Sequence, residues 1–255
     1  MDYVSLKTEN HICIVTMNKQ PGNTYNRQFY CEIRDTFRSV GEMEQVWVVV
    51  LRAEGKHFCT GNDVSEFTTI ANAEAGVEYG RMVGESIASV YECPVPVIGA
   101  INGMALGTGL AIAACCDILI ASENARFGIP EITVGIIGAA CFIARMLPQQ
   151  LHRYMSYSGD IMTADEMKHY GAVLKIVPKD QLLLAAMEIA DHLTQNPPLA
   201  LKGFKAAMNE NENARLKEKY ALEVSYGKKY MFDSEDIQEA FSAFLEKRKP
   251  VFKGK

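Results

Sequence analysis

The sequence predicts a mixed α/β fold of repeating strand, strand and helix turns, followed by a helical C-terminal region. Two observations predict it. Short β-branched apolar segments alternate with segments of helical spacing up to residue 180, and beyond Lys179 the pattern is helical almost to the end of the 255-residue chain. No Gly/Ser-rich linker separates the two parts. We therefore expect one folding unit, with the helical part packed on the α/β body or on a neighbouring subunit.

The first predicted elements are a strand, a helix and a strand. His11–Met17 and Val46–Arg52 are short, apolar and β-branched, as expected of strands that are buried on both faces. Between them, Arg27–Gly41 carries apolar residues at helical spacing, which predicts an amphipathic helix. The buried face of this helix is predicted to hold Phe29, Ile33, Phe37 and Val40.

The middle of the chain continues this alternation. Pro94–Ile101 predicts a buried strand, Leu106–Cys115 a helix of small residues, and Asp117–Ala121 another strand. Val97–Cys116 is nearly uncharged and about as long as a bilayer span. Its glycines and polar residues are weakly hydrophobic, so we expect a soluble segment and no membrane partner.

Local capping signals mark the later elements. Thr163 and Glu166 have capping-box spacing at a helix start. Val173–Val177 predicts a last short strand. Either Asp233 or Ser234 can cap the final helix.

Composition excludes several functional classes. The formal net charge is −5, which provides no general attraction to nucleic acid, and no nucleic-acid recognition motif is present. The seven cysteines are an odd number and most lie in apolar runs, which indicates buried thiols in a reducing cytoplasm. The first ten residues lack the apolar region of a secretory signal. We therefore expect a cytoplasmic protein.

Several catalytic signatures are absent from the sequence. It contains no G-x-S-x-G, H-E-x-x-H, G-x-x-x-x-G-K-[ST] or paired C-x-x-C motif, so serine hydrolysis, zinc chemistry and P-loop nucleotide hydrolysis lose support and no metal is expected. Gly103, Gly107 and Gly109 follow a predicted strand, but their spacing does not fit a dinucleotide-binding turn.

Two loops remain as candidates for chemistry. Phe58–Asp63 and Asn102–Gly109 each follow a predicted strand, at the edge of a parallel sheet where ligands gather. Gly107 lets the backbone approach a ligand, and the N–H of Thr108 is an unpaired donor at a helix start, suited to an oxyanion. A second N–H from the first loop would complete a pair. The alternative is that both loops are tight turns that need glycine.

Five segments in order resemble the crotonase (enoyl-CoA hydratase/isomerase) superfamily. Phe58–Asp63 is similar to its F-x-x-G-x-D loop, and VPVIGAINGMALGTGLAIAACCD (Val95–Asp117) to its glycine-rich segment. Ala125–Gly135 resembles the family motif A-x-F-x-x-P-E-x-x-x-G, and Thr163–Val177 resembles (S/T)-A-x-(E/D)-A-x-x-x-G-L-V. Ala240–Phe252 resembles the A-F-x-E-K-R-x-P-x-F motif with which family sequences usually end. The resemblance spans nearly the whole chain.

The resemblance implies a crotonase-like spiral of ββα turns in residues 1–180, which binds acyl-CoA and performs catalysis. Residues 181–255 then form a helical region for oligomerisation and CoA contacts. It further implies an acyl-CoA thioester substrate and a homo-oligomer, either a trimer or a hexamer. No cofactor is implied, because coenzyme A is part of the substrate.

The resemblance also assigns roles to single residues. The oxyanion donors correspond to the backbone N–H groups of Asn62 and Thr108. The family usually has glycine in place of Thr108, but a backbone donor tolerates threonine, whose side chain narrows the pocket. Of the two glutamates of family hydratases, Glu131 matches the one in the P-E motif, and the other falls on Ala111.

The missing glutamate favours one reaction over another. A single carboxylate suits the transfer of a proton between C2 and C4 of an enoyl thioester, with Glu131 as base and then as acid. Neighbouring isoleucines predict an apolar pocket that raises its pKa towards neutrality. Otherwise Glu131 is a surface carboxylate in a turn. Hydration by an atypical one-glutamate site, decarboxylation or C–C cleavage, and an inactive CoA-binding subunit remain alternatives.

Other residues are expected to contact the substrate. The C-terminal end is basic in an otherwise acidic chain, and the resemblance suggests that some of its charges meet the CoA phosphates. Taken one by one, these side chains also fit a solvated tail. The predicted substrate-binding residues are Phe58, Thr60, Gly61, Asp63, Gly107, Ala111, Lys247 and Phe252.

Overall fold

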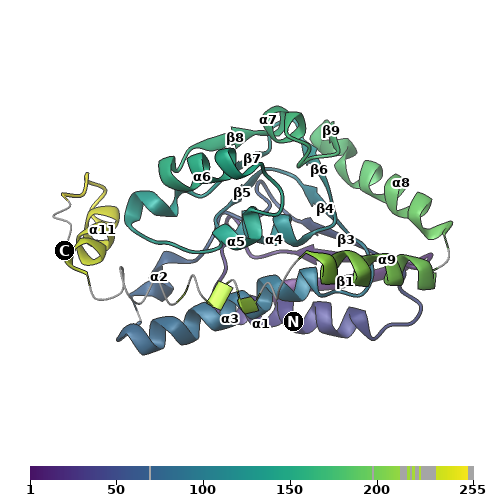
Figure 1. Cartoon of the computed structure of the whole chain (residues 1–255), viewed down its shortest axis with the longest axis horizontal. Helices are drawn as coiled ribbons and strands as arrows, with labels where there is room; N and C mark the ends of the chain where they lie inside the picture. The colour runs from purple at the N-terminus through teal and green to yellow at the C-terminus, as the bar shows by residue number, and fades with distance from the viewer. Residues whose placement is uncertain are drawn as a thin grey trace.

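The computed structural model describes residues 1–68, 70–196, 198–212, 217, 218, 220, 221, 224 and 234–251. The predicted cap at Asp233 and the predicted substrate contact at Phe252 lie outside the described residues. The described residues form a mixed α/β structure with a helical C-terminal region, as predicted (Figure 1).

The main sheet of the described chain has six strands in the order β1-β2-β3-β4-β6-β9. All neighbours are parallel except β1 and β2. Its central strands are apolar on both sides, which is why they are buried on both faces. The strands are β1 (Val4–Glu9), β2 (Ile12–Met17), β3 (Val48–Ala53), β4 (Val97–Ile101), β6 (Ile118–Ser122) and β9 (Lys175–Val177).

A second, three-stranded sheet lies beside the first and consists of β5 (Met104–Leu106), β7 (Arg126–Gly128) and β8 (Ile161–Thr163). β5 and β7 are parallel, with Leu106 opposite Gly128. The chain leaves β5 into one glycine turn and leaves β7 towards Glu131. This small sheet therefore brings together two segments that the sequence predicted to carry chemistry.

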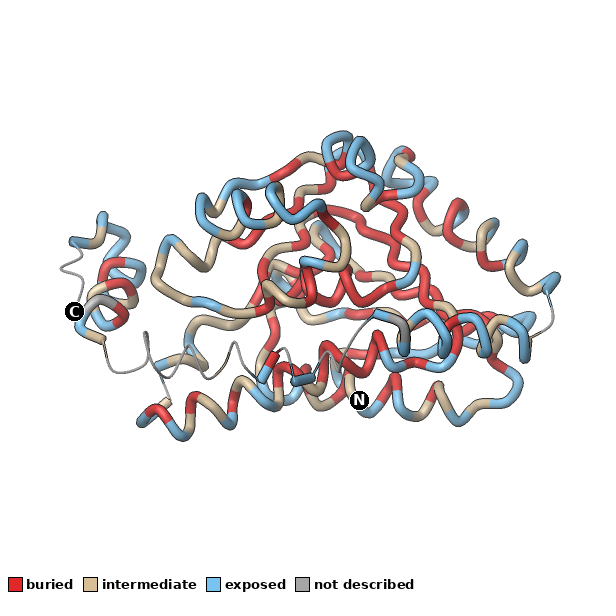
Figure 2. The backbone as a smooth tube through the Cα atoms, viewed as in Figure 1, coloured by how far each residue is buried: buried red, intermediate tan, exposed pale blue. Residues whose placement is uncertain are grey.

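Helices cover both faces of the main sheet. On one face α1 (Arg27–Gly41) packs against α3 (Ala73–Tyr91), and α3 packs against α4 (Thr108–Cys115). On the other face α8 (Leu182–Thr194) contacts β2, β3, β4 and β6. The most deeply buried backbone lies between these layers (Figure 2). Shorter helices complete the body: α2 (Val64–Phe67), α5 (Ala140–Ile143), α6 (Gln149–Ser158), α7 (Ala164–His169), and the 3-10 segments η1 (Pro130–Val134) and η2 (Lys179–Gln181).

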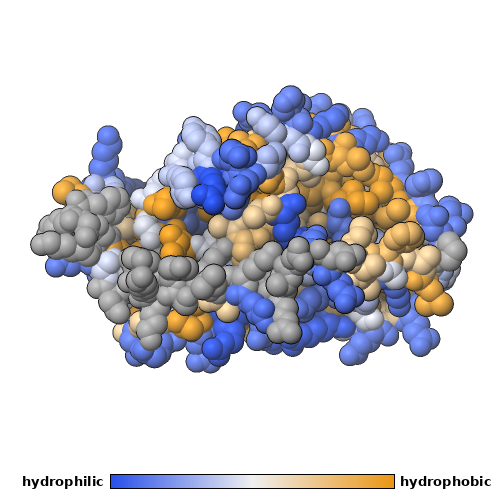
Figure 3. Space-filling model, viewed as in Figure 1, coloured by the Kyte–Doolittle hydropathy of each residue, from blue (hydrophilic) through white to orange (hydrophobic). Residues whose placement is uncertain are grey.

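Two C-terminal helices are described beyond α8. α9 (Pro198–Asn211) is held to the body by Lys205, which is 2% exposed and donates to Asp117 at 2.7 Å and to the Val95 carbonyl at 3.0 Å. α11 (Glu235–Leu245) lies at the opposite end of the molecule, where it contacts η1 (Figure 1). Apolar surface gathers over α8, whose Leu184 is exposed (Figure 3).

Most predicted elements are confirmed. The predicted helix Arg27–Gly41 has the same bounds as α1, and the Thr163–Glu166 capping box and the Ser234 cap are both present. The helix predicted from Leu106 begins at Thr108, because Met104–Leu106 forms a strand with β7.

Several described elements were not predicted. They include β1, whose residues after Val4 are exposed, the three strands of the small sheet, and the helices α2, α3, α5 and α6. Val97–Cys116 forms β4, β5 and α4. Among the described helices, none combines the length and apolar character needed to cross a bilayer.

Candidate active site

The two candidate loops lie side by side. Cys59 in the first loop pairs with Ala105 in β5 as an isolated parallel bridge. The Cys59 N–H donates to the Met104 carbonyl and the Leu106 N–H to the Cys59 carbonyl, both at 2.9 Å. A Cβ on Gly109 would come within 2.3 Å of the Cys59 carbonyl oxygen. The second loop therefore needs glycine there so that its backbone can lie against the first.

The two predicted donor amides have no acceptor among the described residues. The residues on either side of Asn62 are paired with Tyr25, whose N–H donates to the Gly61 carbonyl and whose carbonyl accepts from Asp63. The N–H of Asn62 itself finds no acceptor within the described ranges. Thr108 is the first residue of α4, where an N–H has no partner inside the helix.

The side chains of these two residues meet each other. The Thr108 hydroxyl donates to Asn62 Oδ1 at 2.9 Å. The Tyr30 hydroxyl donates to the same Oδ1 and lies 3.0 Å from Thr108 Oγ1. Tyr30 is fully buried in α1. A third element of the fold thus contacts both loops at once.

Glu131 enters the site from η1, which begins with Pro130, two residues after the end of β7. Its Oε1 lies so close to the glycine turn that a Cβ on Gly107 would be 1.3 Å away, and a Cβ on Gly61 would be 3.5 Å away. Its Oε2 is buried and has no hydrogen-bond partner among the described residues. Glu131 is therefore not a surface carboxylate, and its carboxyl group lies at the junction of the two loops.

Burial controls the protonation of this carboxyl group. Removal from water raises the pKa of Glu131 to about 7, against an ordinary value of 4.5. A raised pKa was predicted from the isoleucines near Glu131 in the sequence, and Ile136 and Ile137 line the same cavity. A group of this pKa can accept and return a proton at neutral pH.

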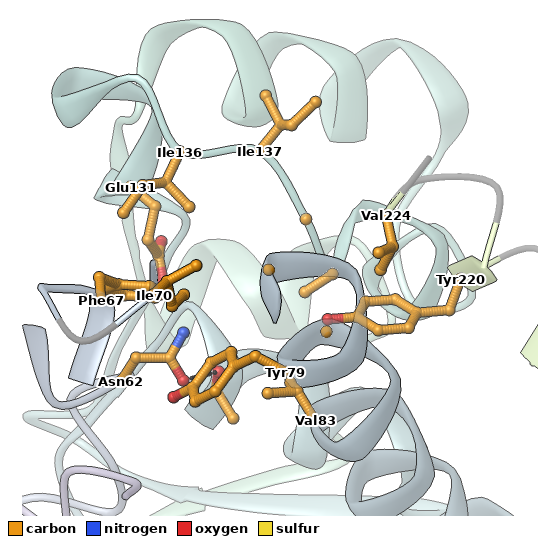
Figure 4. A pocket seen from close by; sticks show the side chains of 15 residues that line it. Asn62, Phe67, Ile70, Tyr79, Val83, Glu131, Ile136, Ile137, Tyr220 and Val224 are labelled. Carbon is orange, nitrogen blue, oxygen red and sulfur yellow. Dashed lines mark hydrogen bonds between the residues drawn. The ribbon is translucent and has the colours of Figure 1, made fainter. Parts of the chain in front are cut away.

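The cavity at this site has a volume of about 70 Å³ and opens to solvent. Figure 4 shows the Glu131 carboxylate and the Asn62 side-chain amide pointing toward one another across it. Its polar groups come mainly from Asn62, Thr108 and Glu131, and its wall is otherwise mostly apolar. The wall includes Phe67, Ile70, Tyr79, Val83, Ile136, Ile137, Tyr220 and Val224.

The first loop contains four further predicted substrate-binding residues, all of which make contacts within the protein. The Gly61 carbonyl accepts from the Tyr25 N–H at 2.9 Å. Phe58 is fully buried. The Thr60 hydroxyl donates to the Gly22 carbonyl at 3.2 Å, and Asp63 caps α2 by accepting from the Ser65 N–H. Contact of these residues with a substrate stays a prediction.

Two more predicted contacts lie elsewhere. Ala111 is fully buried in α4 and is not among the residues that line the cavity. Lys247 is exposed after the end of α11. Their substrate-binding roles also stay predictions.

Several residues of the site did not emerge from the sequence. Tyr79 and Val83 lie on α3, a helix that the apolar pattern did not predict. Tyr30 lies beside Phe29 in a helix that was predicted, and it is buried as deeply as the residues of the apolar face. A tyrosine next to the apolar face of an amphipathic helix was the available signal for a buried hydroxyl.

Comparisons with known proteins identify the family of the chain. Residues 7–255 match the model of the family described as enoyl-CoA hydratase/isomerase. The chain is 32% identical over 255 residues to the short-chain-enoyl-CoA hydratase of Clostridium acetobutylicum. The alignment covers 98% of this chain and 97% of that protein. It is 33% identical over 215 residues to (7aS)-7a-methyl-1,5-dioxo-2,3,5,6,7,7a-hexahydro-1H-indene-carboxyl-CoA hydrolase of Rhodococcus jostii, which covers 84% of this chain and 83% of that protein.

A solved structure gives the same result for the fold. The crystal structure of carnitinyl-CoA hydratase from Mycobacterium avium aligns over 100% of both chains, with a TM-score of 0.86 and 27% identity. Sequence motifs, fold and family match therefore point to one conclusion. This chain belongs to the enoyl-CoA hydratase/isomerase family, in the crotonase superfamily.

Proposed function

We propose that the protein is an enoyl-CoA isomerase that moves a double bond by proton transfer at Glu131. One observation carries the proposal. Glu131 is the only carboxylate among the described residues that line the cavity, and Ala111 stands where family hydratases have their second glutamate. One carboxylate is sufficient for a proton to leave one carbon and return to another.

The chemistry proceeds through an enolate. With a 3-enoyl-CoA, the ionised Glu131 takes a proton from C2. The electron pair of that C–H bond forms a double bond between C1 and C2, and the π pair of the thioester carbonyl moves onto its oxygen. The N–H groups of Asn62 and Thr108 donate to this oxygen and stabilise its charge. The protonated Glu131 then returns the proton to C4, the double bond forms between C2 and C3, and the thioester carbonyl is restored.

Hydration is the second candidate function, and two observations favour it. The Clostridium relative is named as a hydratase. In addition, the Asn62 side-chain amide faces Glu131 across the cavity. An N–H donor opposite a carboxylate is an arrangement that can hold a water molecule between them. A role as an inactive CoA-binding subunit is less favoured, because a buried carboxyl group with a raised pKa has no structural use.

Substrate incubation distinguishes these functions. Purified protein is mixed with 3-enoyl-CoA or 2-enoyl-CoA thioesters of several chain lengths, and the products are separated by chromatography. We expect isomer formation from the 3-enoyl substrate and its loss in Glu131→Gln. A 3-hydroxyacyl product from the 2-enoyl substrate would replace the isomerase proposal by hydration, and tight CoA binding without any product would replace it by the inactive subunit.

The assembly and the CoA contacts are part of the proposal. We expect a trimer or a hexamer, with the apolar surface over α8 as one candidate contact surface. Exposed Lys247 is the described basic residue that we expect near the CoA phosphates. Sedimentation of the protein and CoA titration of Lys247→Ala test the two expectations separately.

A further inference from the structure

Three polar side chains form a cluster behind the two catalytic loops. Tyr30 comes from α1, Asn62 from the loop before α2, and Thr108 from the start of α4. Asn62 Oδ1 accepts from both hydroxyls, and the two hydroxyl oxygens lie 3.0 Å apart. Tyr30 is fully buried and Thr108 is 3% exposed, so water cannot readily replace these hydrogen bonds.

The cluster is connected directly to the groups that would meet the substrate oxygen. Asn62 and Thr108 each carry a backbone N–H donor and a short side chain on the same residue. Because the side chains are short, a displacement of either backbone lengthens the bond between Thr108 Oγ1 and Asn62 Oδ1. A buried hydrogen bond that is lengthened loses stability without compensation from solvent. The separation of the two donors is therefore linked to this cluster.

Tyr30 is suited to hold the cluster in place. Its ring packs between Tyr25, with centroids 4.8 Å apart, and Tyr79, at 6.2 Å in an edge-on arrangement. Burial raises the pKa of the Tyr30 hydroxyl well above its ordinary value, so the group keeps its proton and remains a donor. A rigid ring with a permanent donor gives both loops a fixed point of attachment.

We propose that Tyr30 is a positioning residue that sets the separation of the Asn62 and Thr108 N–H groups, and thereby how strongly they polarise a thioester carbonyl. The inference rests on the proposed enolate chemistry. It does not depend on whether the enolate leads to isomerisation or to hydration. Tyr30 acts through its two neighbours and does not itself touch the reacting atoms.

The test measures carbonyl polarisation directly. A saturated acyl-CoA labelled with ¹³C at the thioester carbonyl is bound to the protein, and the carbonyl stretch is recorded by infrared difference spectroscopy. We expect a shift to lower frequency on binding, and a smaller shift in Tyr30→Phe with the Kd unchanged. We further expect kcat to fall about 10- to 100-fold in this variant, as a small misplacement of catalytic groups does.

Tyr25→Phe is the matched control. Tyr25 is equally buried, and its hydroxyl contacts Met17 Sδ at 3.0 Å instead of the loop side chains. We expect this variant to keep the wild-type carbonyl shift and kcat. A loss in Tyr25→Phe equal to that in Tyr30→Phe would overturn the proposal, because the effect would then come from general loss of packing.

A double-mutant cycle completes the test. In the Asn62→Ala/Thr108→Ala background both partners of the hydroxyl are removed while the two backbone donors remain, and we expect Tyr30→Phe to have no further effect there. An undiminished effect in that background overturns the proposal, as does a wild-type protein whose bound carbonyl is not shifted. If the wild type turns over no enoyl-CoA but its carbonyl shift weakens in Tyr30→Phe, the isomerase proposal fails and the positioning role stands.

Discussion

The Glu131 carboxylate lies against the backbone of Gly107, at the place where any other residue would carry its Cβ. The glycine at this turn therefore does more than permit a positive φ of 51°. It leaves the space that the carboxylate of Glu131, the proposed proton-transferring group, occupies. This relationship joins the P-E motif and the glycine-rich segment through Gly107 and Glu131, which lie more than twenty residues apart in the chain.

Gly107→Ala should abolish most activity. The new methyl group would lie 1.3 Å from Glu131 Oε1, so the carboxylate must move, and a displacement of about 1 Å costs on the order of 100-fold in rate. Measurement of kcat/KM with the enoyl-CoA substrate checks this. Gly171→Ala is the matched control, because Gly171 also has a positive φ, of 80°, but nothing lies within 4 Å of its added Cβ. A similar loss of activity in both variants would contradict the prediction.

The pH–rate profile should contain a group that titrates near neutrality. Glu131 must be ionised to take the first proton, so kcat/KM should rise with pH through about 7, where its pKa lies. With an ordinary glutamate the midpoint of this rise would lie near pH 4.5. The midpoint of the pH dependence of kcat/KM should be the same whichever proton of the substrate is removed. A profile that is flat between pH 5 and 8 would argue against Glu131 as the base.

Glu131→Gln should stabilise the protein at high pH. The folded pKa of about 7 exceeds the ordinary 4.5, so the folded state binds more protons than the unfolded state between these values. The free energy of unfolding is therefore highest below pH 4.5, where Glu131 is protonated in both states. It falls as the pH rises to 7, by up to about 3 kcal/mol. Denaturant unfolding at pH 4 and pH 8 should show a benefit of the substitution only at pH 8. Glu123→Gln, at an exposed position, serves as the control and should show no such difference.

Lys205→Met should destabilise the packing of α9 on the body. The substitution removes the ion-pair partner of Asp117, whose Oδ2 keeps the Val97 N–H as a donor, and leaves the Val95 carbonyl without the Lys205 donor. Loss of one member of a buried ion pair typically costs about 3–5 kcal/mol, and the lower part of that range applies because Asp117 is partly exposed. Urea unfolding measures the cost. Lys202→Met on the same helix is the control and should change the free energy of unfolding little, since Lys202 makes no ion pair within the described residues.

The elements whose apolar pattern is strong could be predicted from the sequence, and α1 was predicted with its observed bounds. β1 has one buried residue out of six, so it lacks the apolar signal of the strands that it extends. The two loops could be located because glycine and strand ends leave local signals. The contact of Tyr30 with both loops could not, because it joins residues 32 and 78 positions apart and depends on how α1 packs.

The small sheet of β5, β7 and β8 has a consequence for motion. The Gly107 N–H donates to the Gly128 carbonyl at 2.9 Å, so the turn that follows β5 and the segment that leads from β7 to Glu131 are joined at neighbouring rungs of one ladder. We expect the turn after β5 and the segment that leads to Glu131 to move together as a rigid body when the surrounding helices move. Thermal motion would then change the entrance of the cavity before it changed the position of Glu131 relative to the Gly107 turn.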